Sequence, residues 1–158
     1  MSGIQSVATM LNTLLKKEDS VQILLENTAH GNRCVGSDIN DFVLIKDLLE
    51  HPEKVKYCLD FAHAYAYGYD LSDTTAFTNF LDSTIGLANI KLIHLNDSAE
   101  ICASKKDKHA LPGLGQIGKE TIQKLINHPS FKEIPKIIEA PISTIELIPQ
   151  TLQDVFNW

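Results

Sequence analysis

The sequence predicts an α/β fold with four parallel strands and flanking helices. Helical and strand-like patterns alternate along the chain, an order that favours parallel strands joined by helical crossovers. Four short apolar runs each end in an ionisable residue. The 158 residues are 44% hydrophobic and 22% charged, a composition that supports one sizeable core. Because no repeat or interdomain linker interrupts the pattern, we expect residues 1–158 to form a single domain.

Five helices are predicted from apolar residues spaced three and four positions apart. The first covers residues 4–17, the second runs from near residue 37 to before Pro52, and the third runs from residue 72 or 73 to Gly86. The last two cover residues 119–127 and 143–156, and Pro149 is expected to kink the final helix. The second helix is expected to bury Phe42, Ile45, Leu48 and Leu49.

The four strands are predicted at residues 21–26, 55–59, 90–95 and 136–139. Their C-terminal ends carry Glu26, Asp60, His94 and Glu139. Because the C-terminal ends of parallel strands meet at one edge of a sheet, these side chains should lie together. Four βα units are too few to close a (β/α)8 barrel, but they match half of one. The open edges of such a sheet require a cover or a partner.

Three further ionisable residues extend this pattern. His63 follows Asp60 by three positions, just past the strand and before a turn that we predict at Gly68, Tyr69 and Asp70. Asp107 and His109 lie in a long polar loop, residues 96–118, where the alternation of an extended chain places both on the same side. Three polar residues beside the strand ends are expected to hydrogen-bond to these side chains, namely Asn27, Asn96 and Asp97.

Carboxylates and histidines in this arrangement are typical ligands of a two- or three-metal phosphoesterase, in which one metal activates water and others hold phosphate oxygens. Taken singly, each residue has an ordinary explanation. Glu26 or Glu139 would be a solvated carboxylate, His94 a hydrogen-bonded core histidine, and the Lys-rich segment around Asp107 a charged turn. Seven such residues at strand ends or in one loop favour a metal site, whereas no such placement applies to His30, His51 and His128.

Composition restricts the other functional classes. The three cysteines form no CxxC pair, which argues against a disulfide framework or a thiolate zinc site. No run of about 18 apolar residues and no signal-sequence pattern occurs, so we expect no membrane association and a cytoplasmic location. The formal charge of -6 is unusual for a nucleic-acid binder. Bound cations would reverse the local field, however, because the negative total includes Glu26, Asp60, Asp107 and Glu139.

Five segments then follow one another in a specific order. They read LENTA at residues 25–29, CLD with HA and GYD within 58–70, IHLNDS at 93–98, DKH with GLGQIG within 107–118, and IEAP at 138–141. Together they are similar to successive motifs of the endonuclease IV family of apurinic/apyrimidinic endonucleases, from about Gly3 to the C-terminus. One departure is that Ala103 and Ser104 stand where the family usually has Gly-Ser.

The resemblance implies that the chain is the C-terminal half of a (β/α)8 TIM barrel. It also implies three zinc ions and hydrolysis of the phosphodiester on the 5′ side of an abasic site in double-stranded DNA. Glu26 resembles the catalytic carboxylate that bridges two of the metals. By the same resemblance, the ligands of one metal are Glu26, Asp60, His94 and Glu139, which we call the four-residue set. The ligands of another form the three-residue set, His63, Asp107 and His109.

In the family, two histidines of the remaining metal lie in the other half of the barrel, and this sequence has no counterpart of them. The resemblance therefore implies two complete zinc sites and one that lacks its N-terminal histidines. The chain would then be a gene fragment, the C-terminal piece of a split enzyme or a shortened protein. Because the sheet edges are open, we expect a partner, either a separately encoded N-terminal half or a second copy of the chain. Two alternatives stay open, a non-catalytic metal-binding remnant and a sugar isomerase or epimerase of the related xylose isomerase-like barrels. The three-residue set disfavours the isomerase.

Overall fold

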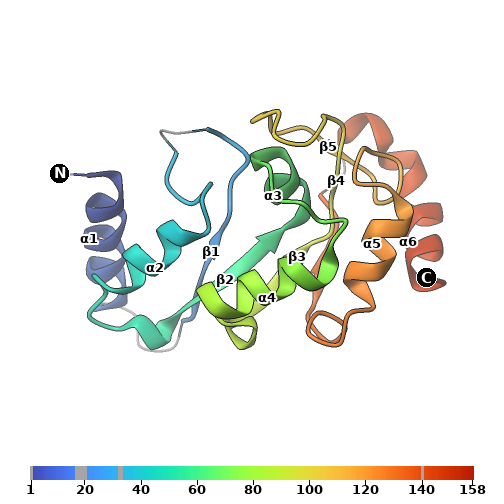
Figure 1. Cartoon of the computed structure of the whole chain (residues 1–158). Coiled ribbons are helices and arrows are strands. Elements are labelled where there is room, and N and C mark those ends of the chain that lie inside the picture. The colour runs from blue at the N-terminus through green and yellow to red at the C-terminus, as the bar shows by residue number, and fades with distance from the viewer. Residues whose placement is uncertain (1, 17–20, 32–33, 140) are drawn as a thin grey trace.

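A computed structural model describes residues 2–16, 21–31, 34–139 and 141–158 of the chain. Its centre is a four-stranded sheet in the order β1-β2-β3-β6 (Figure 1). All three pairings are parallel. The strands are β1 (Ile23–Glu26), β2 (Val55–Asp60), β3 (Ile90–His94) and β6 (Lys136–Ile137). The predicted fold class of four parallel strands with flanking helices is confirmed, although β6 is shorter than the predicted strand.

The sheet has two different faces because alternate side chains point in opposite directions. On β2, Val55, Tyr57 and Leu59 belong to the main hydrophobic core, whereas Cys58 and Asp60 do not. The core side is covered by helices, and burial of each large apolar side chain there contributes about 1.5–3 kcal/mol. The long helices are α1 (Gly3–Leu15), α4 (Thr74–Thr84), α5 (Lys119–Ile126) and α6 (Ile148–Phe156), with α2 (Asn40–Lys46) between α1 and the sheet (Figure 1).

Side-chain caps define where two of these helices begin. The Ser2 hydroxyl accepts a hydrogen bond from the Gln5 backbone N–H, and the Gln5 side chain accepts one from the Ser2 N–H, which together form a capping box for α1. Asp73 caps α4 by accepting from the Ala76 N–H at 2.9 Å, as the sequence predicts. Gly86, with φ of 75°, follows the end of α4.

Two of the predicted helices differ from the observed ones. The second is shorter, since α2 ends at Lys46, and Leu48 is 47% exposed instead of buried. The last is divided into a 3₁₀ segment, Ile142–Leu147, and α6. Pro149 lies in the first turn of α6, where its missing N–H has no helical partner to lose, so it starts a helix instead of kinking one. The end of the first predicted helix at residue 17 lies outside the described residues.

The C-terminal ends of the strands meet the loops at one end of the sheet (Figure 1, top). A short helix, α3 (Phe61–Tyr67), continues directly from β2 at this end. The two-stranded antiparallel pair of β4 (Asp97–Ser98) and β5 (His109–Ala110) lies beside it. Among the described residues, no helix is both long and apolar enough to cross a bilayer.

Candidate metal centre

The four-residue set comes together at the C-terminal ends of all four parallel strands. Register places Asp60 beside His94 on the neighbouring strand. The His94 Nδ1 atom lies 2.9 Å from a carboxylate oxygen of Glu26, 3.2 Å from one of Glu139 and 3.9 Å from one of Asp60. All four side chains offer one donor atom within 4.8 Å of the others. The structure therefore assembles the predicted set from residues 26, 60, 94 and 139.

The three-residue set forms a compact triangle. The Nε2 atoms of His63 and His109 face each other at 3.1 Å. One carboxylate oxygen of Asp107 lies 3.2 Å from His63 Nε2 and 3.3 Å from His109 Nε2. In a tetrahedral site with bonds of about 2.0–2.1 Å, adjacent ligand atoms are about 3.3 Å apart. Three donor atoms with these separations fit one face of such a tetrahedron.

The two sets adjoin each other through shared carboxylates. Asp60 reaches both, because its oxygens lie 3.9 Å from His63 Nδ1 and 3.7 Å from His109 Nε2. One oxygen of Glu26 lies 2.9 Å from His94 Nδ1 and 3.4 Å from His63 Nδ1, the ring nitrogen of His63 that does not face Asp107 and His109. A carboxylate that lies between two groups of donor atoms, as Asp60 does, is suited to bind two adjacent cations.

His63 lies on the helix α3, although no helix is predicted between the second strand and the turn at Gly68. Asp60 is its N-cap, and the Asp60 carboxylate accepts a hydrogen bond from the His63 backbone N–H at 2.7 Å. The signal that predicts a helix here is an Asp followed by an alanine-rich segment, since Asp favours the N-cap and Ala the helix interior. The cap makes Asp60 the last residue of a strand and the first of a helix, so its carboxylate is held in place.

Two buried asparagines tie neighbouring strands together at the site, as predicted from their positions. Asn27, which follows Glu26, donates to the Asp60 carbonyl at 3.0 Å and accepts from the Asp60 N–H at 2.8 Å. Asn96 donates to carboxylate oxygens of Asp60 and Glu139, at 2.7 and 3.1 Å, and accepts from the Glu139 N–H at 2.9 Å. The Asn27 amide therefore fixes the backbone of Asp60, and the Asn96 amide orients the Asp60 and Glu139 carboxylates.

Asp97 was also predicted to contact the ligands, and this prediction is wrong. Its fully buried carboxylate accepts hydrogen bonds from five backbone N–H groups, at distances from 2.7 to 3.2 Å, which come from Ser98, Gly113, Gly115, Ile117 and Gly118. A Cβ atom on Gly115 would lie 2.7 Å from the Asp97 carboxyl carbon, so only glycine fits. The loop after β5 is therefore held around the Asp97 carboxylate by these hydrogen bonds.

The carboxylates change the proton affinity of the histidines. Burial lowers the pKa of His63, but Glu26, Asp60 and Asp107 outweigh it and raise that pKa to about 9. Burial raises the pKa of Asp60. Burial also acts to raise the pKa of Glu26, but hydrogen bonds and charge interactions with His63 and His94 outweigh it, and the pKa of Glu26 is lowered. Without a cation, the site therefore holds a proton on His63 at neutral pH. A bound cation would displace it.

Cys58 lies near the site, although its position in the sequence indicates no role for it there. It is 4% exposed, and its sulfur lies within 4.8 Å of donor atoms of Glu26 and His94. Burial and the nearby Glu26 and Asp60 carboxylates raise its pKa to about 12. The thiol is therefore neutral beneath the four-residue set, and the nitrogen and oxygen donors above it suit zinc or a similar divalent ion.

The chain is similar to known proteins in both sequence and fold. A sequence profile of the xylose isomerase-like TIM barrel family matches residues 2–157. The "Probable endonuclease 4" of Mycoplasma genitalium is 33% identical over 143 residues, which are 90% of this chain and 49% of that protein. The crystal structure of endonuclease IV from Thermus thermophilus superposes with a TM-score of 0.84 at 29% identity, covering 98% of this chain and 55% of that one.

A D-tagatose 3-epimerase-like protein also superposes, with a TM-score of 0.63 at 18% identity, and this likeness concerns the fold alone. The family match, the endonuclease 4 relatives and the superposition on the Thermus thermophilus enzyme confirm the resemblance to endonuclease IV found in the sequence. The chain spans about half the length of the curated relatives it matches.

Proposed function

The chain belongs to the xylose isomerase-like TIM barrel family, and on this premise we propose that it is the metal-binding part of a zinc-dependent endonuclease. Its substrate would be double-stranded DNA with an abasic site, cut at the phosphodiester on the 5′ side. The motif resemblance and the curated endonuclease 4 relatives support the reaction class. The abasic site and the choice of zinc rest on the resemblance together with the donor set.

The observation that carries the proposal is the triangle of His63, Asp107 and His109 beside the four-residue set. Bound divalent cations would supply Lewis-acid stabilisation of a phosphate and lower the pKa of water. The residues of the chain would do the rest. Asp60 lies between the two sets, Asn27 holds its backbone, and Asn96 orients the Asp60 and Glu139 carboxylates. The proton held on His63 leaves when the site is filled.

Metal analysis of the purified chain tests the proposal. We expect about two zinc ions per chain after gentle dialysis, one for each set. The double variant Asp60→Ala and His109→Ala removes a donor from each and should bind much less zinc. The matched control is His51→Ala, because His51 precedes β2, at the opposite end of that strand from Asp60, and its half-exposed side chain pairs with Glu53. No bound zinc on the unaltered chain, or an unchanged content in the double variant, would overturn the proposal.

Zinc binding and DNA incision together distinguish the proposed endonuclease from the two alternatives. A non-catalytic remnant would bind zinc without cleaving an abasic-site duplex under any condition. A sugar isomerase or epimerase would act on sugars. The three-residue set, which comes from α3, β5 and the loop before β5, gives no support to that alternative. Incision of a duplex that carries one tetrahydrofuran abasic analogue separates the endonuclease from both.

A further inference from the structure

The loop that leads to Asp107 contains two residues in an unusual backbone conformation. Ala103 and Lys105 have φ of 60° and 59°, and they are the two non-glycine residues with positive φ in the described part of the chain. Side chains disfavour this left-handed region, so surrounding contacts must hold the segment in it. At Ala103, the residue type departs from the glycine that the endonuclease IV motif usually has.

Those contacts come from the C-terminal end of α3. The Ala103 N–H donates to the Tyr65 carbonyl at 3.1 Å, and the Lys105 N–H donates to the Ala66 carbonyl at 2.9 Å. The Lys105 ammonium donates to the Tyr67 carbonyl and lies 3.4 Å from the centre of the Tyr67 ring, a cation–π contact. The loop thus satisfies three carbonyls that the end of a helix leaves unpaired. We call Tyr67, Ala103 and Lys105 the clasp.

The clasp joins the two segments that supply the three-residue set. The helix α3 carries His63 in its first turn, and the loop reaches Asp107 two residues after Lys105. The donor atoms of these two ligands lie 3.2 Å apart, although 44 positions separate them in the sequence. Their separation therefore depends on how the loop is attached to the helix.

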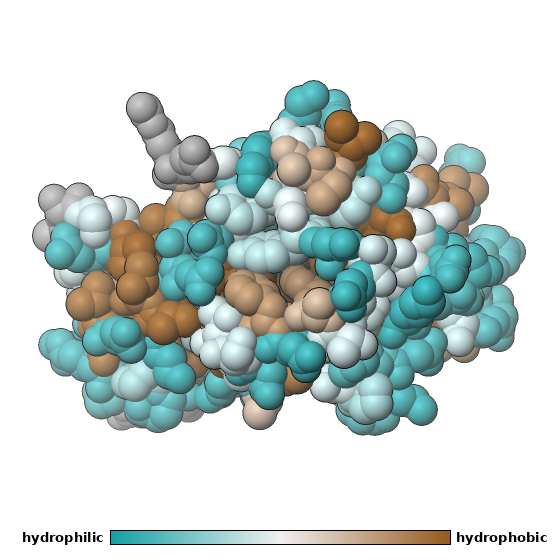
Figure 2. All heavy atoms as spheres, viewed as in Figure 1, coloured by the Kyte–Doolittle hydropathy of each residue, from teal (hydrophilic) through white to brown (hydrophobic). Residues whose placement is uncertain are grey.

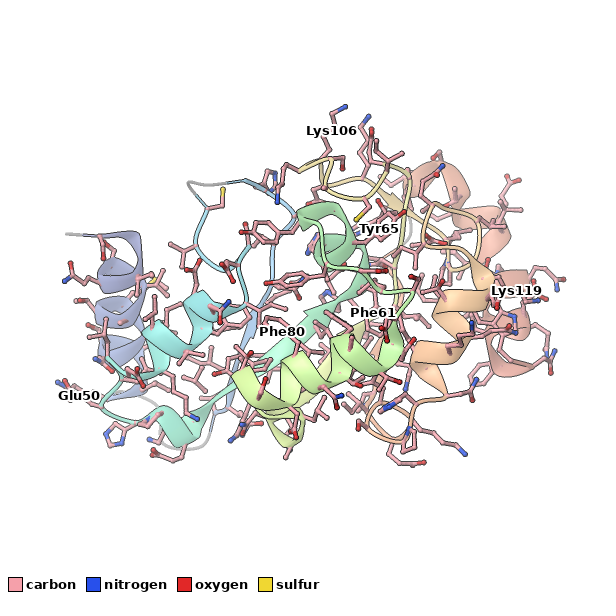
Figure 3. The ribbon with its side chains drawn as sticks, viewed as in Figure 1. Glu50, Phe61, Tyr65, Phe80, Lys106 and Lys119 are labelled. Atoms are coloured by element: carbon pink, nitrogen blue, oxygen red, sulfur yellow. The ribbon has the colours of Figure 1, made fainter. Side chains whose placement is uncertain are left out.

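We propose that Lys105 is a positioning residue of the three-residue set, which holds Asp107 in place against His63 by clasping the loop to the end of α3. This inference rests on the metal-binding part of the proposed function. For Lys105, the inference replaces the ordinary explanation of the Lys-rich segment, which is a solvated charged turn. Lys106 and Lys108 behave differently, since both are 63% exposed and pair with Glu100. Lys106 extends away from the body of the molecule at the tip of the loop (Figure 3).

The test compares Lys105→Met with Lys106→Met in a zinc titration of the whole chain. Imidazole NMR signals of His63 and His109 report on the three-residue set, and those of His94 report on the four-residue set. We expect Lys105→Met to weaken zinc binding at His63 and His109 by about tenfold or more, as is usual when a group that supports a ligand is lost. Binding at His94 should be unchanged, and Lys106→Met should resemble the unaltered chain.

Two further variants keep the test decisive. Lys105→Arg retains a cation over the Tyr67 ring and should restore most of the affinity. Lys105→Gly accommodates the positive φ without the side chain, so it should stay folded and still lose affinity, even where Lys105→Met fails to fold. Equal affinities at His63 in Lys105→Gly and Lys106→Met would overturn the inference alone. No zinc on the unaltered chain would overturn the proposed function and this inference with it.

Discussion

His63 contacts polar or charged groups of the site through both of its ring nitrogens. Its Nδ1 atom lies 2.8 Å from the Asn27 carbonyl oxygen, an acceptor, and 3.4 Å from a Glu26 oxygen, while its Nε2 atom faces Asp107 and His109. Acceptors around a histidine stabilise the imidazolium, which explains the pKa of about 9. The neutral imidazole that a cation requires is therefore the minor form below that pH.

This competition predicts that zinc binds more tightly as pH rises. Between pH 6.5 and about 9, each ion bound at the three-residue set must displace the His63 proton, so its apparent affinity should rise by about tenfold per pH unit. Calorimetry in buffers of different ionisation enthalpy should detect the released proton near pH 7.5. A zinc affinity independent of pH over this range would contradict the prediction.

The stability of the metal-free chain should depend on pH with the opposite sign. A raised histidine pKa contributes stability that is fully present below the unfolded-state value of 6.5 and is lost as pH rises through about 9. His63→Gln lacks this contribution. The difference in thermal midpoint between the unaltered chain and His63→Gln, both without metal, should therefore shrink between pH 6.5 and 9. A constant difference would show that the proton is not held on His63.

At the scale of elements, the loop between β5 and α5 depends on one carboxylate. Asp97 extends from β4 and accepts from five N–H groups, four of them 16 to 21 positions further along the chain. A carboxylate is needed because both of its oxygens act only as acceptors, whereas the amide of an Asn presents an NH₂ on one side.

We therefore predict that Asp97→Asn destabilises the chain by about 2–4 kcal/mol, because the new NH₂ would face the N–H groups of Gly113, Gly115 and Gly118. Urea unfolding followed by circular dichroism measures the change. Asp47→Asn, at an exposed position, is the matched control and should change stability by less than about 0.5 kcal/mol. Similar effects of the two substitutions would contradict this account of the loop.

Periodicity predicts the elements that bury a regular apolar face, and this is why the four strands and their ionisable ends are found where expected. It fails where a distant partner decides the structure. The role of Asp97 is set by N–H groups of a loop that closes only in three dimensions. The helix α3 ends in Tyr65, Ala66 and Tyr67 before Gly68, a composition that also suits a turn, and its carbonyls are capped by residues 103–105. Neither contact leaves a local pattern in the sequence.

At the scale of the whole molecule, the sheet ends at β1 on one side and at β6 on the other. Hydrophobic side chains gather on the surface over α1 and α2 (Figure 2), where Met10, Leu14, Leu44 and Leu48 are 45–54% exposed. Near the other edge, Ile137 on β6 is 49% exposed and Phe156 on α6 is 84% exposed. Open strand edges beside exposed apolar residues favour association.

We expect the chain alone to associate at micromolar concentration, either with itself or with a polypeptide that provides the complementary strands. Light scattering coupled to size exclusion measures this. Ile137→Lys adds a charge to the edge strand and should reduce self-association, whereas Lys91→Arg, at an exposed position on β3, keeps the charge and should not. A monodisperse monomer of the unaltered chain at these concentrations would show that the flanking helices and loops protect the edges by themselves.

We expect catalysis by these 158 residues alone to be slow. Both ligand sets are present, so a substrate phosphate would still be oriented, but the two histidines that the resemblance implies for a further cation do not occur in the sequence. We therefore expect the chain alone to cleave an abasic-site duplex at least ~100-fold more slowly than the Thermus thermophilus enzyme, the effect typical of losing one main electrostatic contributor.

Adding the part of that enzyme not matched by this chain should restore incision in zinc buffer. Glu26→Gln should abolish the restored activity, because Glu26 resembles the carboxylate that bridges two of the metals, and His51→Ala should not. Full activity of the chain alone would show that the further histidines are dispensable, and no incision in the mixture, with both partners folded and zinc bound, would favour a non-catalytic metal-binding role.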